Sequence, residues 1–339
     1  MQHINWQQLP KIDLHLHLDC SLSYQVVQQI DPTITQAMYN TQFVAPKKCV
    51  NLKDFLDRAV SGSNLMQTTQ AIALVVHDLF TQLQHDNTLY AEIRFAPHLH
   101  LQKGLTPFEV VQAAEIATAQ AVKNTGIEAR LILCTLRHFT EAQSMQTVQL
   151  VEQFAGTYVA GFDIAGDEAG CPIDNHVAAF KYAQQKNLYI TAHAGEAKGA
   201  ESVWEVLQHF GPSRIGHGVR SIEDGKLIDY LKQHKIHLEL CPHCNVSIDI
   251  YNTYQQHPID KLYKSGVSIN VNTDNRGVTP ITITQEYQSL HQHFGWGIAD
   301  FYKCSVNAIN AAFIPATLKT SLIEKLTQGY NLQNLGLII

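Results

Sequence analysis

Eight strand-like segments alternate with helical segments along this chain of 339 residues, and that order constrains the fold more than any other feature. We expect strands at residues 11–19, 89–97, 128–137, 159–166, 188–193, 214–218, 237–242 and 267–274. Strands that alternate with helices form βαβ units and a parallel sheet. Eight such units in a chain of this length favour an α/β fold of the closed (β/α)8 barrel type over an open sheet.

Helices are expected between the strands and after the last one. The sequence places them at residues 21–30, 51–69, 71–83, 107–123, 141–154, 175–186, 200–210, 224–234, 260–265 and 299–333, and the final segment should pack outside the barrel. No linker rich in Pro, Gly or Ser, no block of charge and no internal repeat marks a boundary. We therefore expect residues 1–339 to form a single domain.

Composition excludes several classes of protein. The net charge of −6 argues against a nucleic-acid partner, for which a basic surface is expected. No apolar run reaches the length of about 18 residues that a membrane span needs, and the N-terminus lacks the basic and apolar regions of a signal peptide. Seven cysteines, an odd number scattered along the chain, do not resemble a disulfide framework and favour a reducing cytoplasm.

The first strand carries the pattern His-x-His. Ile12, Leu14 and Leu16 alternate there with polar residues, so His15 and His17 point to the same face. Their Cα atoms are then about 6–7 Å apart, and two neutral imidazoles so placed can reach one metal ion. The alternative is a surface strand with two solvated histidines.

Polar residues also collect where other predicted strands end, and in a (β/α)8 barrel the active site lies at the C-terminal ends of the strands. His193 and Glu196 end one strand, His217 lies in another, and Asp274 ends the last. His15, His17, His193 and Asp274 form a plausible ligand set, because imidazole nitrogens with one carboxylate oxygen suit Zn²⁺ and leave a position for water. The alternative for His193 or Asp274 alone is a hydrogen-bonded residue at the barrel rim.

Cys241 and Cys244 form a Cys-x-x-Cys pair, which can be redox-active or half of a zinc knuckle. No second pair accompanies it, so two small buried thiols are favoured. The pattern His-x-Glu with Pro-Cys-x-x-Cys, which defines the small zinc deaminases of the cytidine type, is absent.

The motifs KIDLHLHLDCS, AEIRFAPH, GFDIAGDEAG, TAHAGE, RIGHG, LCPHCN and NVNTDN, in this order, resemble the adenosine deaminase family of the amidohydrolase superfamily. The resemblance runs from residue 11 to the NAINAAFIP segment at residues 307–315. It implies zinc-dependent hydrolytic deamination of adenosine, and of 2′-deoxyadenosine, to inosine and ammonia in purine salvage. It also implies one zinc ion per chain, held by His15, His17, His193 and Asp274.

The resemblance assigns further roles residue by residue. Glu196 would protonate N1 of the purine, and His217 would orient and help to deprotonate the attacking water. Gly166 would donate its backbone N–H to N3, Asp19 would hold a ribose hydroxyl, and His17 would lie beside the substrate. Leu52, Phe55 and Leu56 match an apolar lid helix, whereas the helical spacing alone is equally compatible with a helix that packs on the core.

The chemistry supports the role of Glu196 without the family. Attack at C6 costs the aromaticity of the ring unless N1 is protonated. Glu196 lies three residues past His193 and can share its site, provided that burial raises its pKa enough for it to act as an acid near neutral pH.

Two positions depart from the family pattern. Cys20 replaces a glycine that usually follows the acid of the first strand, and it would be strained if that backbone required a positive φ. Asn275 replaces a second aspartate, and because N7 of a purine is an acceptor, we expect the Asn275 amide to donate to N7.

The substrate within the family is indicated by Asp19, since adenine deaminases tend to have glutamate there. The alternative is adenine or another 6-aminopurine, such as aminodeoxyfutalosine or an N6-modified nucleotide. A nucleotide would need a basic phosphate site, for which Lys47, Lys48 and Lys198 are candidates. The oligomeric state is not predicted from the sequence.

Overall fold

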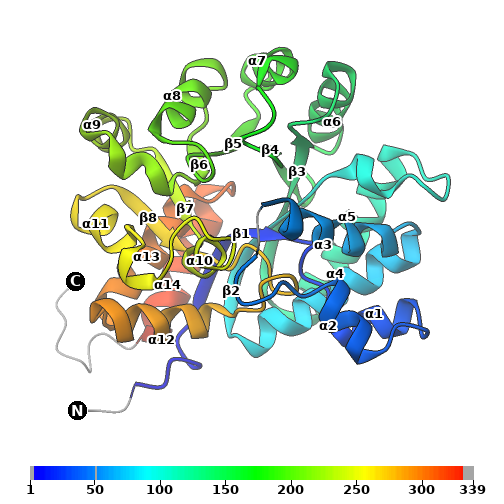
Figure 1. Cartoon of the computed structure of the whole chain (residues 1–339), viewed down its shortest axis with the longest axis horizontal. Helices are drawn as coiled ribbons and strands as arrows, with labels where there is room; N and C mark the ends of the chain where they lie inside the picture. The colour runs from blue at the N-terminus through cyan, green and yellow to red at the C-terminus, as the bar shows by residue number, and fades with distance from the viewer. Residues whose placement is uncertain (1–3, 50–51, 331–339) are drawn as a thin grey trace.

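Eight parallel strands form one barrel-shaped sheet, in chain order from β1 to β8, in the computed structural model (Figure 1). The structure describes residues 4–49 and 52–330, and the side chains of these residues other than 52–54, 56 and 57. The strands are β1 Lys11–His17, β2 Thr88–Phe95, β3 Glu128–Leu136, β4 Val159–Ala165, β5 Tyr189–Ala194, β6 Arg214–His217, β7 His237–Leu240 and β8 Ser268–Val271. The predicted (β/α)8 barrel is therefore confirmed.

The barrel closes between β1 and the residues that follow β8. Leu16 forms a parallel bridge with Asp274. The backbone N–H of His17 donates to Asp274 O at 2.8 Å, and the N–H of Asp274 donates to His15 O at 2.8 Å. This closure joins two predicted ligand segments that are more than 250 residues apart in the sequence.

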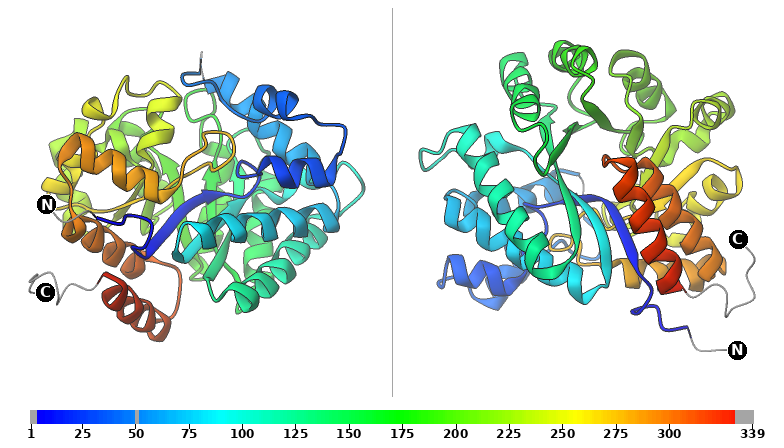
Figure 2. Two further views of the ribbon diagram at one scale, coloured as in Figure 1. Left: turned by 90° about the horizontal axis from the view of Figure 1, so that it is seen from below. Right: turned by 180° about the vertical axis from the view of Figure 1, so that it is seen from behind.

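Helices surround the sheet and extend the fold beyond a minimal barrel (Figures 1 and 2). They are α1 Tyr24–Ile30, α2 Gln36–Gln42, α3 Leu52–Leu65, α4 Thr69–His85, α5 Pro107–Thr125, α6 Glu141–Gln153, α7 Val177–Gln185, α8 Ala200–His209, α9 Gly225–Gln233, α10 Pro242–Ser247, α11 Ile259–Lys264, α12 Ile283–Phe294, α13 Ile298–Ala311 and α14 Ala316–Tyr330. None of the helices in this described part of the chain combines the length and apolarity that a membrane span requires.

The helices differ from the sequence prediction at a few points. Helices α2, α10 and α12 are not predicted, although Thr282 and Gln285 form a capping box at the start of α12. The predicted helix at residues 299–333 is two helices, because Pro315 cannot continue α13 and instead precedes α14. Both pack beside the barrel as expected (Figure 2), and residues 331–333 of that prediction lie outside the described chain.

Alternate side chains of β1 face the inside of the barrel and the surrounding helices, rather than a buried core and solvent. Leu14 and Leu16 are fully buried, and so is His15 on the opposite face. Apolar side chains fill the layer between strands and helices in one continuous core. The polar side chains of β1 point into the barrel, where they meet polar side chains from other strands.

Two arginines neutralise buried carboxylates inside the barrel. Arg94 of β2 donates to Asp163 Oδ2 at 2.7 Å and to Glu239 Oε2 at 2.6 Å. Arg214 of β6 contacts Glu239 Oε1 at 2.8 Å and Glu92 Oε2 at 2.5 Å. Burial alone would raise the pKa of Glu239, but the two guanidinium groups outweigh burial and hold that pKa below its usual value.

We expect Arg94→Met to destabilise the fold strongly, because it leaves Asp163 buried without its arginine partner and Glu239 with one partner fewer. Breaking a buried ion pair from one side costs about 3–5 kcal/mol. Denaturant unfolding of the variant and the parent protein measures this loss.

Arg130→Met is the matched control. Arg130 of the neighbouring strand β3 lies nearer the surface, 3.6 Å from Glu128. Its loss should cost no more than about 1 kcal/mol. Equal destabilisation by the two substitutions would contradict the special role of the interior network.

Candidate metal centre and substrate cavity

Four side chains from three separate segments converge at the C-terminal end of the barrel. His17 Nε2 lies 3.2 Å from His193 Nε2. Asp274 Oδ1 lies 3.4 Å from His17 Nε2 and 3.6 Å from His15 Nε2. The structure thus brings together the four residues that the sequence proposes as ligands.

Carboxylates behind two of the histidines fix which ring nitrogen faces the centre. His15 Nδ1 donates to Glu239 Oε2 at 2.8 Å, and His193 Nδ1 donates to Asp163 Oδ1 at 3.2 Å. A carboxylate only accepts, so each Nδ1 carries the proton and each Nε2 presents its lone pair to the centre. His15 Nε2 is buried and has no hydrogen-bond partner within the described residues.

This donor set fits a divalent metal ion. Three imidazole nitrogens and one carboxylate oxygen match the ligands of catalytic zinc and related ions, and a cation would satisfy the orphaned His15 Nε2. The pKa values of His15 and His17 are lowered well below the ordinary value, mainly by burial, so both rings are neutral and able to ligate.

The backbone around the centre is strained at two non-glycine residues. Asp274 has φ 64° and His217 has φ 59°, in the left-handed region that costs most residues about 1–3 kcal/mol. Gly216 precedes His217, and a Cβ atom at that position would lie 2.9 Å from His15 Cε1. Glycine is therefore required there for the strand to pass the metal-site histidines.

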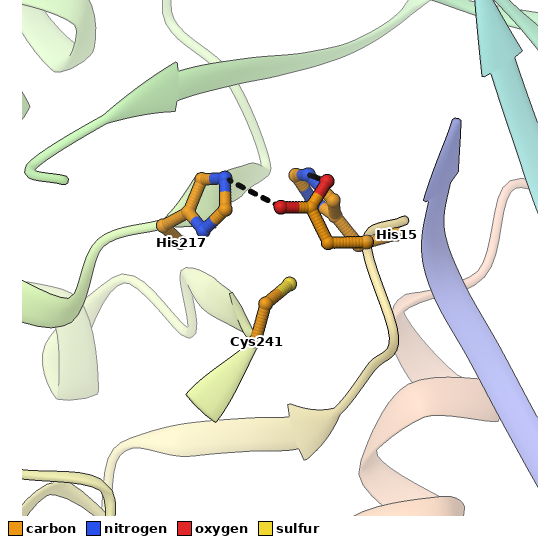
Figure 3. A group of neighbouring side chains, drawn as sticks. His15, His217 and Cys241 are labelled. Atoms are coloured by element: carbon orange, nitrogen blue, oxygen red, sulfur yellow. Dashed lines mark ion pairs between the residues drawn. The ribbon is translucent and has the colours of Figure 1, made fainter. Parts of the chain in front are cut away.

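His217 links the metal centre to Glu196. His217 Nε2 lies 4.0 Å from Asp274 Oδ2 (Figure 3). Its Nδ1 lies 3.3 Å from Glu196 Oε1. Asn245 Nδ2 donates to the same Glu196 oxygen at 2.7 Å, and His257 Nε2 lies 3.1 Å from Asn245 Oδ1. Burial, with the negative charges of nearby Asp274 and other carboxylates, raises the pKa of Glu196 well above its usual value.

Glu168 organises the loop that carries Glu196. Its carboxylate accepts hydrogen bonds from all four backbone N–H groups of residues 195–198, at 2.6–3.1 Å, and from the hydroxyl of Ser202. Neither Glu168 nor Asn245 is assigned a role from the sequence. Their only signal is their position directly after predicted strands.

Two free thiols, Cys241 and Cys244, lie beside the centre. Cys241 Sγ belongs to a group with His15, His217 and Asp274 whose ligand atoms lie within 4.8 Å of one another (Figure 3). Burial raises the pKa of this thiol well above its usual value, and its Sγ donates to a backbone carbonyl of β7 at 3.6 Å, so it is a neutral donor. Cys244 is also a free buried thiol, which confirms the expectation of two small buried thiols.

A cavity of about 270 Å³ opens beside the metal centre. Its lining includes most of the predicted substrate-binding and catalytic residues: His17, Asp19, Phe55, Gly166, His193, Glu196, His217, Asp274 and Asn275. Apolar side chains complete the wall, from Ala59, Val60, Leu99, Leu136 and Ile248. A mostly apolar cavity with a few convergent polar groups is typical of a small-molecule site.

The predicted lid falls on helix α3. Phe55 lines the cavity, whereas the side chains of Leu52 and Leu56 lie outside the part of the structure that describes side chains. The structure therefore places one of the three lid residues over the site.

Asp19 and Cys20 form one side of the cavity. Burial raises the pKa of Asp19 to about 6, and the Cys20 thiol donates to Asp19 Oδ1 at 3.7 Å. Cys20 is not among the residues with positive φ, so cysteine in place of glycine causes no backbone strain here.

No lysine or arginine lines the cavity among the described side chains. Lys48 instead pairs with Asp249, and neither Lys47 nor Lys198 reaches the lining. The three phosphate-binding candidates are thus not brought to the site.

The chain resembles curated relatives over nearly its whole length. A family model described as "Adenosine deaminase" matches residues 10–329. A Streptomyces coelicolor protein named "Adenosine deaminase 1" is 34% identical over 346 aligned residues, which cover 95% of this chain and 87% of the relative.

Solved structures show the same fold. An adenine deaminase from Arthrobacter aurescens aligns with a TM-score of 0.86 at 21% identity, covering 94% of this chain and 98% of its own. An amidohydrolase from Burkholderia ambifaria, whose crystal structure holds bound zinc, aligns with a TM-score of 0.88 at 20% identity, covering 98% of this chain and 94% of its own. With a family model over residues 10–329 and a relative at 34% identity, this chain belongs to the adenosine deaminase family.

Proposed function

We propose that the chain catalyses the zinc-dependent hydrolytic deamination of adenosine, and of 2′-deoxyadenosine, to inosine and ammonia. One observation carries this proposal. A half-buried acid, Glu196, lies 3.3 Å from His217 in the cavity that three of the four proposed metal ligands, His17, His193 and Asp274, also line. An acid, a base and a metal site around one cavity are what attack of water on an aminopurine ring requires.

His15, His17, His193 and Asp274 would hold one zinc ion per chain. The zinc in the Burkholderia structure and the nitrogen and oxygen donors of this site support that choice of metal. Zinc bound there would supply Lewis acidity, by which this ion makes water nucleophilic near neutral pH.

Glu196 acts on N1 of the purine. Asn245 Nδ2 donates a hydrogen bond to Glu196 Oε1 at 2.7 Å. Glu196 Oε2 is therefore the oxygen that carries the proton and donates it to N1. Protonation at N1 makes C6 more electrophilic. It thereby offsets the cost of losing the aromaticity of the ring when water adds to C6. The shielded position of Glu196 favours its protonated form at neutral pH.

His217 acts on the attacking water. Its Nε2 faces the metal centre, while its Nδ1 faces Glu196 and Asn245. Nε2 orients the water and accepts its proton as the bond between oxygen and C6 forms. His217 then gives this proton to the exocyclic nitrogen, and the bond between that nitrogen and C6 breaks. The C6 hydroxyl returns a proton to the Glu196 carboxylate as the carbonyl forms, so ammonia leaves, inosine remains, and both side chains regain their starting protonation states.

The remaining cavity residues select the substrate. Asp19 accepts a hydrogen bond from a ribose hydroxyl, Gly166 donates its N–H to N3, His17 flanks the substrate, and the apolar wall that includes Phe55 covers the ring. The absence of lysine and arginine from the described lining favours a nucleoside over a nucleotide. The Arthrobacter adenine deaminase shares the fold, so adenine is the alternative substrate.

With zinc bound, we expect the purified protein to convert adenosine to inosine and to act far more slowly on adenine and AMP. The change in ultraviolet absorbance of each substrate measures this. Asp19→Ala should lower kcat/KM for adenosine about ten- to a hundredfold, since hydrogen bonds to a charged group contribute about 1.5–3 kcal/mol. Turnover of adenine but not adenosine by the parent protein would move the activity to the alternative substrate.

Glu196→Gln should lower kcat for adenosine by about 10²–10⁴, because glutamine keeps the shape of the side chain but cannot supply a proton. Metal content, measured by mass spectrometry of the purified variant, should stay at one zinc per chain. Full activity of this variant, or loss of its metal, would contradict the assignment of Glu196 as the acid.

Asn275→Ala tests the contact with N7. Asn275 lines the cavity, and its Nδ2 also donates weakly to Cys244 Sγ at 3.5 Å, which leaves one amide hydrogen for the substrate. We expect kcat/KM to fall for adenosine but to change little for 7-deaza-adenosine, which has no acceptor at that position. An equal loss with both substrates would remove this contact from the proposal.

A further inference from the structure

A second cavity lies at the opposite end of the barrel from the metal centre. Its volume is about 520 Å³. It is bounded by the first residues of the last four strands, Tyr189, Arg214, His237 and Ser268, and by the connection between α13 and α14. Strand starts lie at one end of the barrel and the metal ligands at the other, so this cavity is separate from the proposed active site.

The lining of this basal cavity is basic. It contains Arg214, Lys232, Lys235 and Lys319, and none of its lining residues is an aspartate or glutamate. This is unexpected in a chain whose net charge is −6.

Two of the four positive charges have carboxylate partners behind the lining. Arg214 is neutralised by Glu92 and Glu239 inside the barrel. Lys232 Nζ lies 2.9 Å from the exposed carboxylate of Asp229.

The other two positive charges, those of Lys235 and Lys319, form no ion pair with a carboxylate among the described residues. Lys319 Nζ donates to the carbonyl oxygen of Asn310 at 2.6 Å, which is a neutral acceptor. No described residue provides a hydrogen-bond acceptor or an ion-pair partner for Lys235 Nζ. Burial also lowers the pKa of Lys319, a penalty that a bound anion would relieve. The basal cavity thus presents two lysines that form no ion pair with a carboxylate of the described chain, although the more distant Glu92 raises the pKa of Lys319.

An aromatic surface stands at the rim. Tyr189 is 50% exposed, the kind of large aromatic side chain that a folded protein usually covers. Its ring stacks on Phe313 with a centroid separation of 4.7 Å and an interplanar angle of 8°. Phe313 covers one face of the ring, and half of the Tyr189 side chain remains exposed, which offers surface on which a second flat ring can stack.

We propose that the basal cavity binds a nucleoside 5′-monophosphate. A phosphate monoester carries a charge of about −1.5 to −2 at pH 7, which matches the two lysines that form no ion pair. The base would stack on Tyr189, and the amides of Asn307 and Asn310 lie in the lining to meet polar groups of the ligand. The volume falls within the range of about 300–1,000 Å³ that is usual for small-molecule sites.

Isothermal titration calorimetry of the zinc-loaded full chain with uridine 5′-monophosphate tests this proposal, because that pyrimidine nucleotide has no 6-amino group to be removed. Uridine and inorganic phosphate are the comparison ligands, and each should bind at least about tenfold more weakly, since each lacks one of the two contacts. Equal binding of inorganic phosphate, or no binding of the nucleotide, would overturn the proposal.

Charge reversal at both lysines, Lys235→Glu with Lys319→Glu, should weaken binding of the nucleotide at least about tenfold. Lys181→Glu on α7, an exposed lysine outside the lining, is the matched control and should bind as the parent does. Tyr189→Leu should weaken binding of the nucleotide and leave that of inorganic phosphate unchanged. Unchanged nucleotide affinity in the double variant would place the ligand elsewhere.

If the double variant does not fold, nucleotide binding by Lys235→Ala is measured instead. This variant should fold, because Lys235 is exposed and its side chain has no partner in the described structure to lose. Adenosine turnover should be unchanged in all these variants. A protein that binds the nucleotide but does not deaminate adenosine would refute only the proposed activity.

Discussion

The buried contacts of Arg94 with Asp163 and Glu239 hold the catalytic end of the barrel together. Each carboxylate accepts a hydrogen bond from a metal-site histidine as well, so one guanidinium group supports both His15 and His193. Without the arginine, the buried carboxylates of Asp163 and Glu239 would tend to become protonated. They would then accept hydrogen bonds from the imidazole N–H groups less strongly. The same contacts therefore stabilise the fold and fix the tautomers of the site.

The functional end of the barrel is built at the expense of local stability. Asp274 and His217 have left-handed backbone conformations, and the lone pair of His15 Nε2 is buried without a partner. Such strain persists where the surroundings determine the conformation, and here the two backbone hydrogen bonds between β1 and Asp274 do so. A bound cation would satisfy the buried donor atoms and recover part of this cost.

The two ends of the barrel have opposite chemical character. The C-terminal end gathers carboxylates and imidazoles in a cavity whose described lining has no lysine or arginine, whereas the basal cavity gathers lysines without a carboxylate. The interior network lies between them, since Arg214 lines the basal cavity and also contacts Glu239, which accepts a hydrogen bond from His15. A nucleoside and an anion would thus be attracted to different ends of the same barrel.

The sequence by itself determined the order of strands and helices and the residues at the strand ends, because alternation and spacing along the chain are local properties. It therefore indicated the barrel and placed His15, His17, His193, Glu196, His217 and Asp274 at its C-terminal end. Only the tertiary structure decided which other side chains contact and support these residues. Glu168 binds four N–H groups of a loop about thirty residues away, and Lys235 and Lys319 share a cavity although they lie far apart in the chain. Such contacts follow from closure of the barrel, which sets distances that no local pattern encodes.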